Sequence, residues 1–64
     1  MKFVVEIELG NDAMRTGRHL GEALADLAGH IRHDIGAREP SFRDEGSIRD
    51  ENGNKVGSWR FEPE

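Results

Sequence analysis

Residues 48–61, with the sequence IRDENGNKVGSWRF, limit the possible folds more than any other part of the chain. Asn52-Gly53 is typical of a type I′ turn, because both central residues of that turn need a positive φ, which Asn and Gly tolerate best. The apolar and polar residues on both sides of this pair suit antiparallel strands. The sequence therefore predicts a β-hairpin over residues 47–61.

Two registers of this hairpin are possible. A two-residue turn places Ile48 opposite Gly57. The same turn makes an opposite-charge pair of Asp50 and Lys55. A three-residue turn with a glycine bulge places Ile48 opposite Val56 instead. Because a slip of one residue moves every side chain to the other face of the sheet, the apolar pattern decides between the registers.

We favour the two-residue turn, which puts Ile48, Trp59 and Phe61 on one face, the face that meets the core. Gly57, opposite Ile48, then leaves room for another element to approach closely.

A single helix cannot cover both faces of a sheet, so the other face, here called the open face, meets solvent or a partner. It is expected to carry Val4, Glu6, Glu8, Arg49, Val56, Ser58 and Arg60.

Residues 2–9 alternate between apolar and polar side chains, as half-buried strands do. The residues on the apolar face are Phe3, Val5, Ile7 and Leu9. Gly10-Asn11-Asp12 ends the strand, and we expect Met14 to turn inward in the short turn that follows.

The next segment predicts a helix over about residues 17–34. Thr16 is favoured over Asp12 as the N-cap, and Gly36 suits the C-terminal end. The apolar stripe of the helix consists of Leu20, Leu24, Leu27 and Ile31. Residues 36–45 form a polar loop, and we expect Phe42 to pin this loop to the core.

The order strand, helix, strand, strand predicts an α+β domain, with one helix on a three-stranded, mainly antiparallel sheet. A helix of this length returns the chain to the start of the first strand. The simplest sheet therefore has the strand order 1-3-2. The order 3-2-1, with a right-handed crossover between two parallel strands, remains possible. The 64 residues form a single domain, and residues 62–64 are expected to be a tail.

The composition narrows the class of protein. The chain has no cysteine, which excludes disulfides and thiolate metal sites. The longest apolar stretch is interrupted by Glu6 and Glu8, so we expect no signal peptide or membrane span. We predict a cytoplasmic protein that needs no cofactor. The formal net charge of −4, with interspersed signs, argues against nonspecific nucleic-acid binding.

The helix carries one pattern that could bind a metal ion. Asp26, His30 and His33 supply one carboxylate and two imidazoles at helical spacing. We favour the simpler interpretation that these side chains are solvated or paired along the helix, because a stable zinc site needs more ligands. We therefore predict no metal site, and a metal-binding protein or small enzyme acting through these histidines is the third possibility for the function.

No residue pattern indicates catalysis. None of the hydroxyl residues lies in a motif that would activate a nucleophile; they are Thr16, Ser41, Ser47 and Ser58. A small sheet with one helix offers little cleft in which to shift pKa values. We predict that the protein is not an enzyme and has no catalytic residues.

Nucleic-acid binding is the alternative function. The arginines that would carry it are spread over the helix and loops instead of forming one basic face; they are Arg15, Arg18, Arg32, Arg38 and Arg43. The aromatic residues are expected to face the core, where they could not stack on bases.

Small residues form a flank of the helix, here called the small-residue flank: Gly17, Gly21 and Ala25. Small side chains allow a second backbone to approach closely. The flank either packs under the protein's own 36–45 loop or contacts a second protein chain. We predict interaction surfaces at this flank and on the open face, where the residues are Val4, Glu6, Arg49, Val56 and Arg60. The outer strand edges could also pair with a partner strand.

The pattern D-x-N-G-N-x-V-G-x-W of residues 50–59, together with the helix and the strand order, resembles small proteins encoded by phages and mobile elements of high-GC bacteria. No activity is assigned to that group, so the resemblance implies no catalytic or binding residues. It implies an accessory or host-interacting role. We therefore expect a non-enzymatic protein-interaction module that self-associates as a homodimer.

Overall fold

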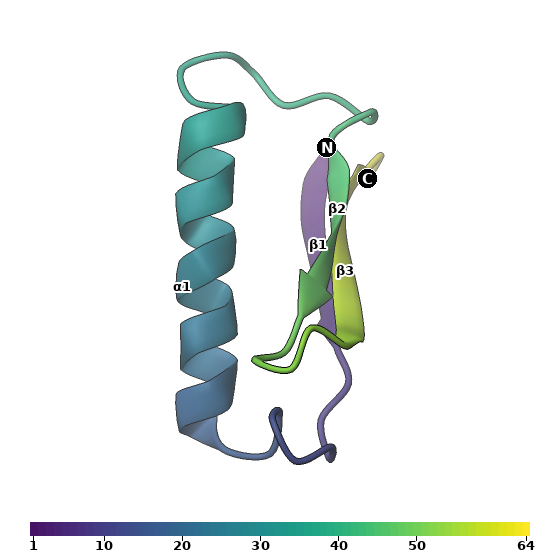
Figure 1. Ribbon diagram of the computed structural model, residues 1–64. Helices are drawn as coiled ribbons and strands as arrows, with labels where there is room; N and C mark the ends of the chain where they lie inside the picture. The colour runs from purple at the N-terminus through teal and green to yellow at the C-terminus, as the bar shows by residue number, and fades with distance from the viewer.

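The computed structural model describes all residues, 1–64. Its elements are β1 (Lys2–Ile7), α1 (Gly17–Asp34), β2 (Glu45–Arg49) and β3 (Lys55–Glu62). The three strands form one antiparallel sheet in the order β1-β3-β2, and α1 lies along one face of it (Figure 1). The predicted α+β class and the order 1-3-2 are confirmed, and the order 3-2-1 is excluded.

The helix has the predicted bounds because both of its ends are capped by local residues. Thr16 has an extended backbone, and its hydroxyl accepts a hydrogen bond from the His19 N–H at 3.3 Å. The His19 ring nitrogen Nδ1 accepts in return from the Thr16 N–H at 3.4 Å. After the last turn Gly36 adopts a φ of +56°, and its N–H donates to the Ile31 carbonyl at 3.1 Å.

The hairpin has the favoured register at its centre, where Ile48 lies opposite Gly57. Gly57 also lies against β1: a Cβ added there would collide with the Glu6 carbonyl oxygen. The predicted close approach at this glycine is therefore confirmed. A side chain at this position would push β1 away from β3.

The predicted type I′ turn is wrong, because Gly53 is the only residue of the turn with a positive φ, at +82°. Asp50 does not pair with Lys55 as expected; Lys55 lies opposite Arg49 instead. Asp50 is buried, and its Oδ1 accepts the backbone N–H groups of Asn52 and Asn54, each at 2.9 Å. A carboxylate that satisfies two loop N–H groups stabilises a wider loop than the two-residue turn.

The register shifts by one residue between Ile48 and Arg49. Val56 is the extra residue of the resulting β-bulge, and its side chain is buried in the core with 6% exposed. The prediction that Val56 lies on the open face is therefore wrong. A bulge puts two consecutive residues out of the usual alternation, so simple counting along β3 fails here.

The core lies between α1 and the sheet, and its buried residues are Met14, Ala23, Leu27, Ile35, Ile48, Val56 and Trp59. Met14 is inward, as predicted, with 1% exposed. Phe61 is only partly buried beside this cluster, although it was expected in the core.

Four further apolar residues predicted to be inside are instead exposed: Phe3 by 43%, Leu9 by 60%, Leu24 by 43% and Phe42 by 57%. The first strand ends at Ile7, before Leu9, and Ala23 takes the inward position expected of Leu24. Phe42 is not needed to pin the loop, because Arg38 holds it through a two-pronged hydrogen bond to Asp44, at 2.7 and 2.9 Å.

Candidate interaction surfaces

The open face is polar and is crossed by one ion-pair network. Arg60, on the central strand, donates from Nη2 to Glu6 Oε1 at 2.7 Å and from Nε to Glu62 Oε2 at 2.6 Å. Val4 is half-buried directly opposite Arg60. The hydrogen bonds from Glu62 and Glu6 raise the pKa of Arg60, and Arg60 in turn lowers the pKa of Glu62. Glu62 lies opposite Lys2 and belongs to β3, so the prediction that the tail begins at this residue is wrong.

The small-residue flank is open to solvent. Gly17, Gly21 and Ala25 are all exposed, and a Cβ added at Gly17 or Gly21 would meet no atom within 4 Å. The interpretation that this flank packs under the 36–45 loop is therefore wrong. Next to it on the helix is Leu24, on the side away from Asp26 and towards β1.

Two large apolar side chains are exposed on separate elements, Leu24 on the helix and Phe3 on β1; they are here together called the apolar β1 side. Each is 43% exposed. Phe3 packs against the Phe61 and Trp59 rings, with centroid distances of 4.9 and 6.1 Å. The outer edge of β1 runs beside it, since β1 pairs only with β3.

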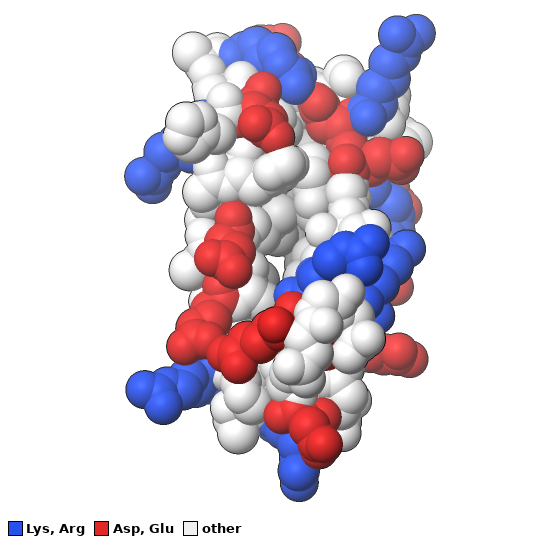
Figure 2. Space-filling model, viewed as in Figure 1, with Lys and Arg blue, Asp and Glu red and all other residues white.

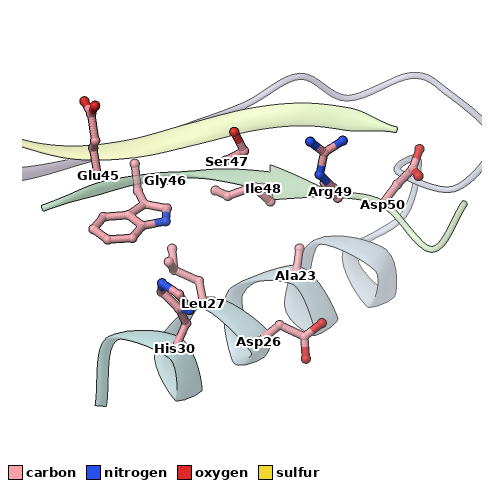
Figure 3. A pocket seen from close by; sticks show the side chains of 11 residues that line it. Ala23, Asp26, Leu27, His30, Glu45, Gly46, Ser47, Ile48, Arg49 and Asp50 are labelled. Carbon is pink, nitrogen blue, oxygen red and sulfur yellow. The ribbon is translucent and has the colours of Figure 1, made fainter. Parts of the chain in front are cut away.

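A groove of about 570 Å³ lies between the helix and β2; it is here called the α1–β2 groove. Leu27, Ile48 and Trp59 are among the apolar residues that line it, and Asp26 and His30 line its helix side (Figure 3). Figure 2 shows this hollow between the helix and the sheet, with acidic side chains on the helix side at mid-height and basic side chains on the sheet side. Gly46 also lines the groove, and a Cβ there would lie 2.5 Å from the Trp59 Nε1.

The candidate metal ligands do not come together. His30 Nε2 lies 2.9 Å from Asp34 Oδ2, and its ring makes an edge contact with Trp59 at a centroid distance of 5.6 Å. Asp26 and His33 are exposed on the same helix. No group of three or more histidine, aspartate or glutamate side chains could hold a metal ion.

Several arginines proposed for nucleic-acid binding lie beside carboxylates. Arg15 lies 3.6 Å from Asp12, and Arg18 lies 4.0 Å from Glu22. Arg38 is bound to Asp44, which lowers the pKa of that carboxyl to about 2; the Ser41 N–H contributes further. Pairing of this kind leaves less positive charge for a phosphate backbone.

Sequence reasoning missed the role of Asp50. Burial alone would raise the pKa of this carboxyl, but hydrogen bonds from the backbone of Asn54 and Asn52, and from the Asn54 and Asn11 side chains, lower it. The signal was present as an Asp two residues before an Asn-Gly pair, a position from which the side chain can accept loop N–H groups.

No helix of the structure combines the length and the apolar character that crossing a membrane requires. No protein-family model, no curated protein and no solved structure matches this chain.

Proposed function

We propose that this chain is a non-enzymatic protein-interaction module that self-associates, and that it acts in the cytoplasm as an accessory protein of a phage or mobile element. The accessory role rests on the resemblance of the hairpin pattern at residues 50–59. The absence of cysteine favours the cytoplasm.

The observation that carries the protein-interaction role is the apolar surface that the molecule leaves uncovered. Phe3, on the strand with a free edge, and Leu24, next to the open small-residue flank, are each 43% exposed. A single exposed apolar residue is ordinary, but an exposed phenylalanine on a strand with an unpaired edge favours a protein contact. A chain this short also buries a small core, so association would add stability.

The arrangement of polar groups supports binding over catalysis. The Thr16 hydroxyl accepts the His19 backbone N–H, and Ser47 and Ser58 lie opposite each other on the sheet; none of these three hydroxyls is hydrogen-bonded to a histidine ring. On the open face Arg60 is bound to two carboxylates, Glu6 and Glu62, so this network carries a net negative charge, which favours a protein surface over a nucleic-acid surface.

The solution mass tests this proposal. Light scattering on a sizing column, across a concentration series, is expected to give twice the chain mass of 7.2 kDa. At about 1 mM chain, a contact worth only about 4 kcal/mol would already hold half of the chains in dimers. A strict monomer at this concentration would therefore exclude self-association.

A further inference from the structure

The outer edge of β2 presents unpaired backbone groups at alternate residues. The Val56 carbonyl accepts the Glu8 N–H, so it points towards β1. Backbone groups alternate in direction along a strand, so those of Ser58 also point to β1 and those of Gly57 and Trp59 point to β2. Ile48 and Gly46, opposite Gly57 and Trp59, therefore bond to β3.

The same alternation directs the N–H and C=O of Ser47 outward, together with those of Glu45 and Arg49. The Asp50 N–H agrees with this alternation, because it donates to the Asn54 carbonyl on the other side of the hairpin and so points towards β3. β2 is thus a strand of five residues whose central residue, Ser47, can both donate and accept at the free edge.

We infer that β2 pairs antiparallel with β2 of a second copy about a twofold axis at Ser47, an inference that rests on the proposed self-association. In such a pair, residues at equal distances from the axis lie opposite each other. Glu45 of one copy then faces Arg49 of the other, twice per dimer. Gly46 likewise faces Ile48 of the second copy.

The charges on the open face fit this register. The Glu45, Ser47 and Arg49 side chains point to the same face of β2, away from the helix (Figure 3). Neither Glu45 nor Arg49 forms an ion pair within its own chain. Opposite charges directly across an antiparallel pair stabilise it, and like charges destabilise it.

The helix-side face fits as well. Gly46 has no side chain, and the Trp59 indole fills the place of its Cβ, so this ring lies next to the position that Ile48 of the second copy would face. The joined sheet would bring the second helix alongside the first, over the α1–β2 groove with its apolar lining of Ala23, Leu27 and Trp59.

The edge of β1 offers a poorer match to a second copy. Glu8 bonds to Val56, so the alternation directs the backbone groups of Phe3, Val5 and Ile7 outward and the twofold axis would lie at Val5. Phe3 would then face Ile7 and Val4 would face Glu6, so no opposite-charge pair within β1 fixes the register. Pairing through both edges would produce an open ribbon of copies, whereas pairing through β2 alone closes a dimer. The apolar β1 side then remains available to a different protein.

A charge swap tests the register. Arg49→Glu and Glu45→Arg each replace two opposite-charge contacts per dimer with two like-charge contacts, so each is expected to raise the dimer dissociation constant about tenfold or more in light scattering. The double variant E45R/R49E restores opposite charges and is expected to return the constant to within about threefold of the natural value. Circular dichroism melting establishes that each variant is folded.

Two further variants separate the strand edge from other surfaces. Ser47→Pro removes the outward N–H without touching a bond to β3 and is expected to abolish the dimer, whereas Ser47→Ala keeps the N–H and the dimer. Leu24→Glu alters the apolar β1 side and is expected to leave the dimer intact.

The outcomes distinguish this inference from the proposed function. A dimer that survives both charge reversals, fails to respond to the double variant, or is lost in Leu24→Glu overturns pairing through β2 while self-association stands. A natural chain that is monomeric at every concentration overturns both.

Discussion

At the scale of single residues, carboxylates hold the loops of this protein. Asp50 accepts the N–H groups of the hairpin loop, and Asp44 accepts from Arg38 and from the Ser41 N–H in the loop that precedes β2. Both pKa values lie below the ordinary aspartate value, because the charged form is the one that accepts these hydrogen bonds. Neither loop has a large apolar anchor, since Phe42 is exposed.

These carboxylates predict a loss of stability in acid. The folded-state pKa of Asp44, about 2, lies below its ordinary value of 3.8, so its contribution is present above pH 3.8 and is lost as the pH falls towards 2. Urea unfolding between pH 5 and about 2 should therefore show a falling free energy of unfolding. In Asp44→Asn this fall should be smaller; an unchanged pH profile would show that the Arg38–Asp44 pair does not persist in solution.

At the scale of elements, glycines have opposite roles in the sheet and in the helix. Gly57 and Gly46 lie where a Cβ would strike the β1 backbone or the Trp59 ring. Gly17, Gly21 and Gly29 open onto empty space, and helix glycines cost stability because they lose more backbone entropy on folding than alanine does. These three glycines therefore lower the stability of the helix without serving its packing, and their positions can accept a larger side chain.

The two classes of glycine predict opposite effects of alanine. Gly57→Ala should destabilise the fold by about 1–3 kcal/mol, because β1 has to move away from β3. Gly29→Ala should stabilise it by about 0.5–1 kcal/mol, because the helix gains propensity without a clash. Chemical denaturation of both variants measures the two signs, and a Gly57→Ala variant as stable as the natural chain would contradict the close approach of β1.

At the scale of the whole molecule, one helix covers one face of a three-stranded sheet and leaves two strand edges unpaired. Apolar side chains stay exposed on the β1 side, while the β2 side is hollowed into a groove. A small two-layer molecule of this kind can gain stability from a second copy, because association covers edges and apolar surface that the chain cannot cover itself.

The proposed self-association also predicts a melting temperature that rises with protein concentration, because mass action would favour a folded dimer over unfolded chains. Calorimetry or circular dichroism over a hundredfold concentration range would show this rise in the natural chain. In Arg49→Glu the melting temperature should depend less on concentration. A midpoint independent of concentration in the natural chain would mean that folding and association are not linked.

The sequence alone determined the features that depend on local residues: the helix from Thr16 to Gly36, the alternation of β1, the α+β class and the pairing of Ile48 with Gly57. Each follows from a cap, a periodicity or a glycine that acts within a few residues of itself. The strand order 1-3-2 could also be predicted from the sequence, because the length of the helix and the hairpin together leave few possible strand orders.

Only the tertiary structure decided which apolar residues became buried and which surfaces stayed open. Val56 is inside because a bulge breaks the alternation of β3, and Leu24 is outside because α1 turns Ala23 and Leu27 towards the sheet. The groove beside β2 and the outward Ser47 N–H follow from how the layers meet. These outcomes depend on contacts between residues far apart in the chain. A local sequence pattern determines neither how a helix is rotated about its axis over a sheet nor which backbone groups stay unpaired at the edge of the sheet.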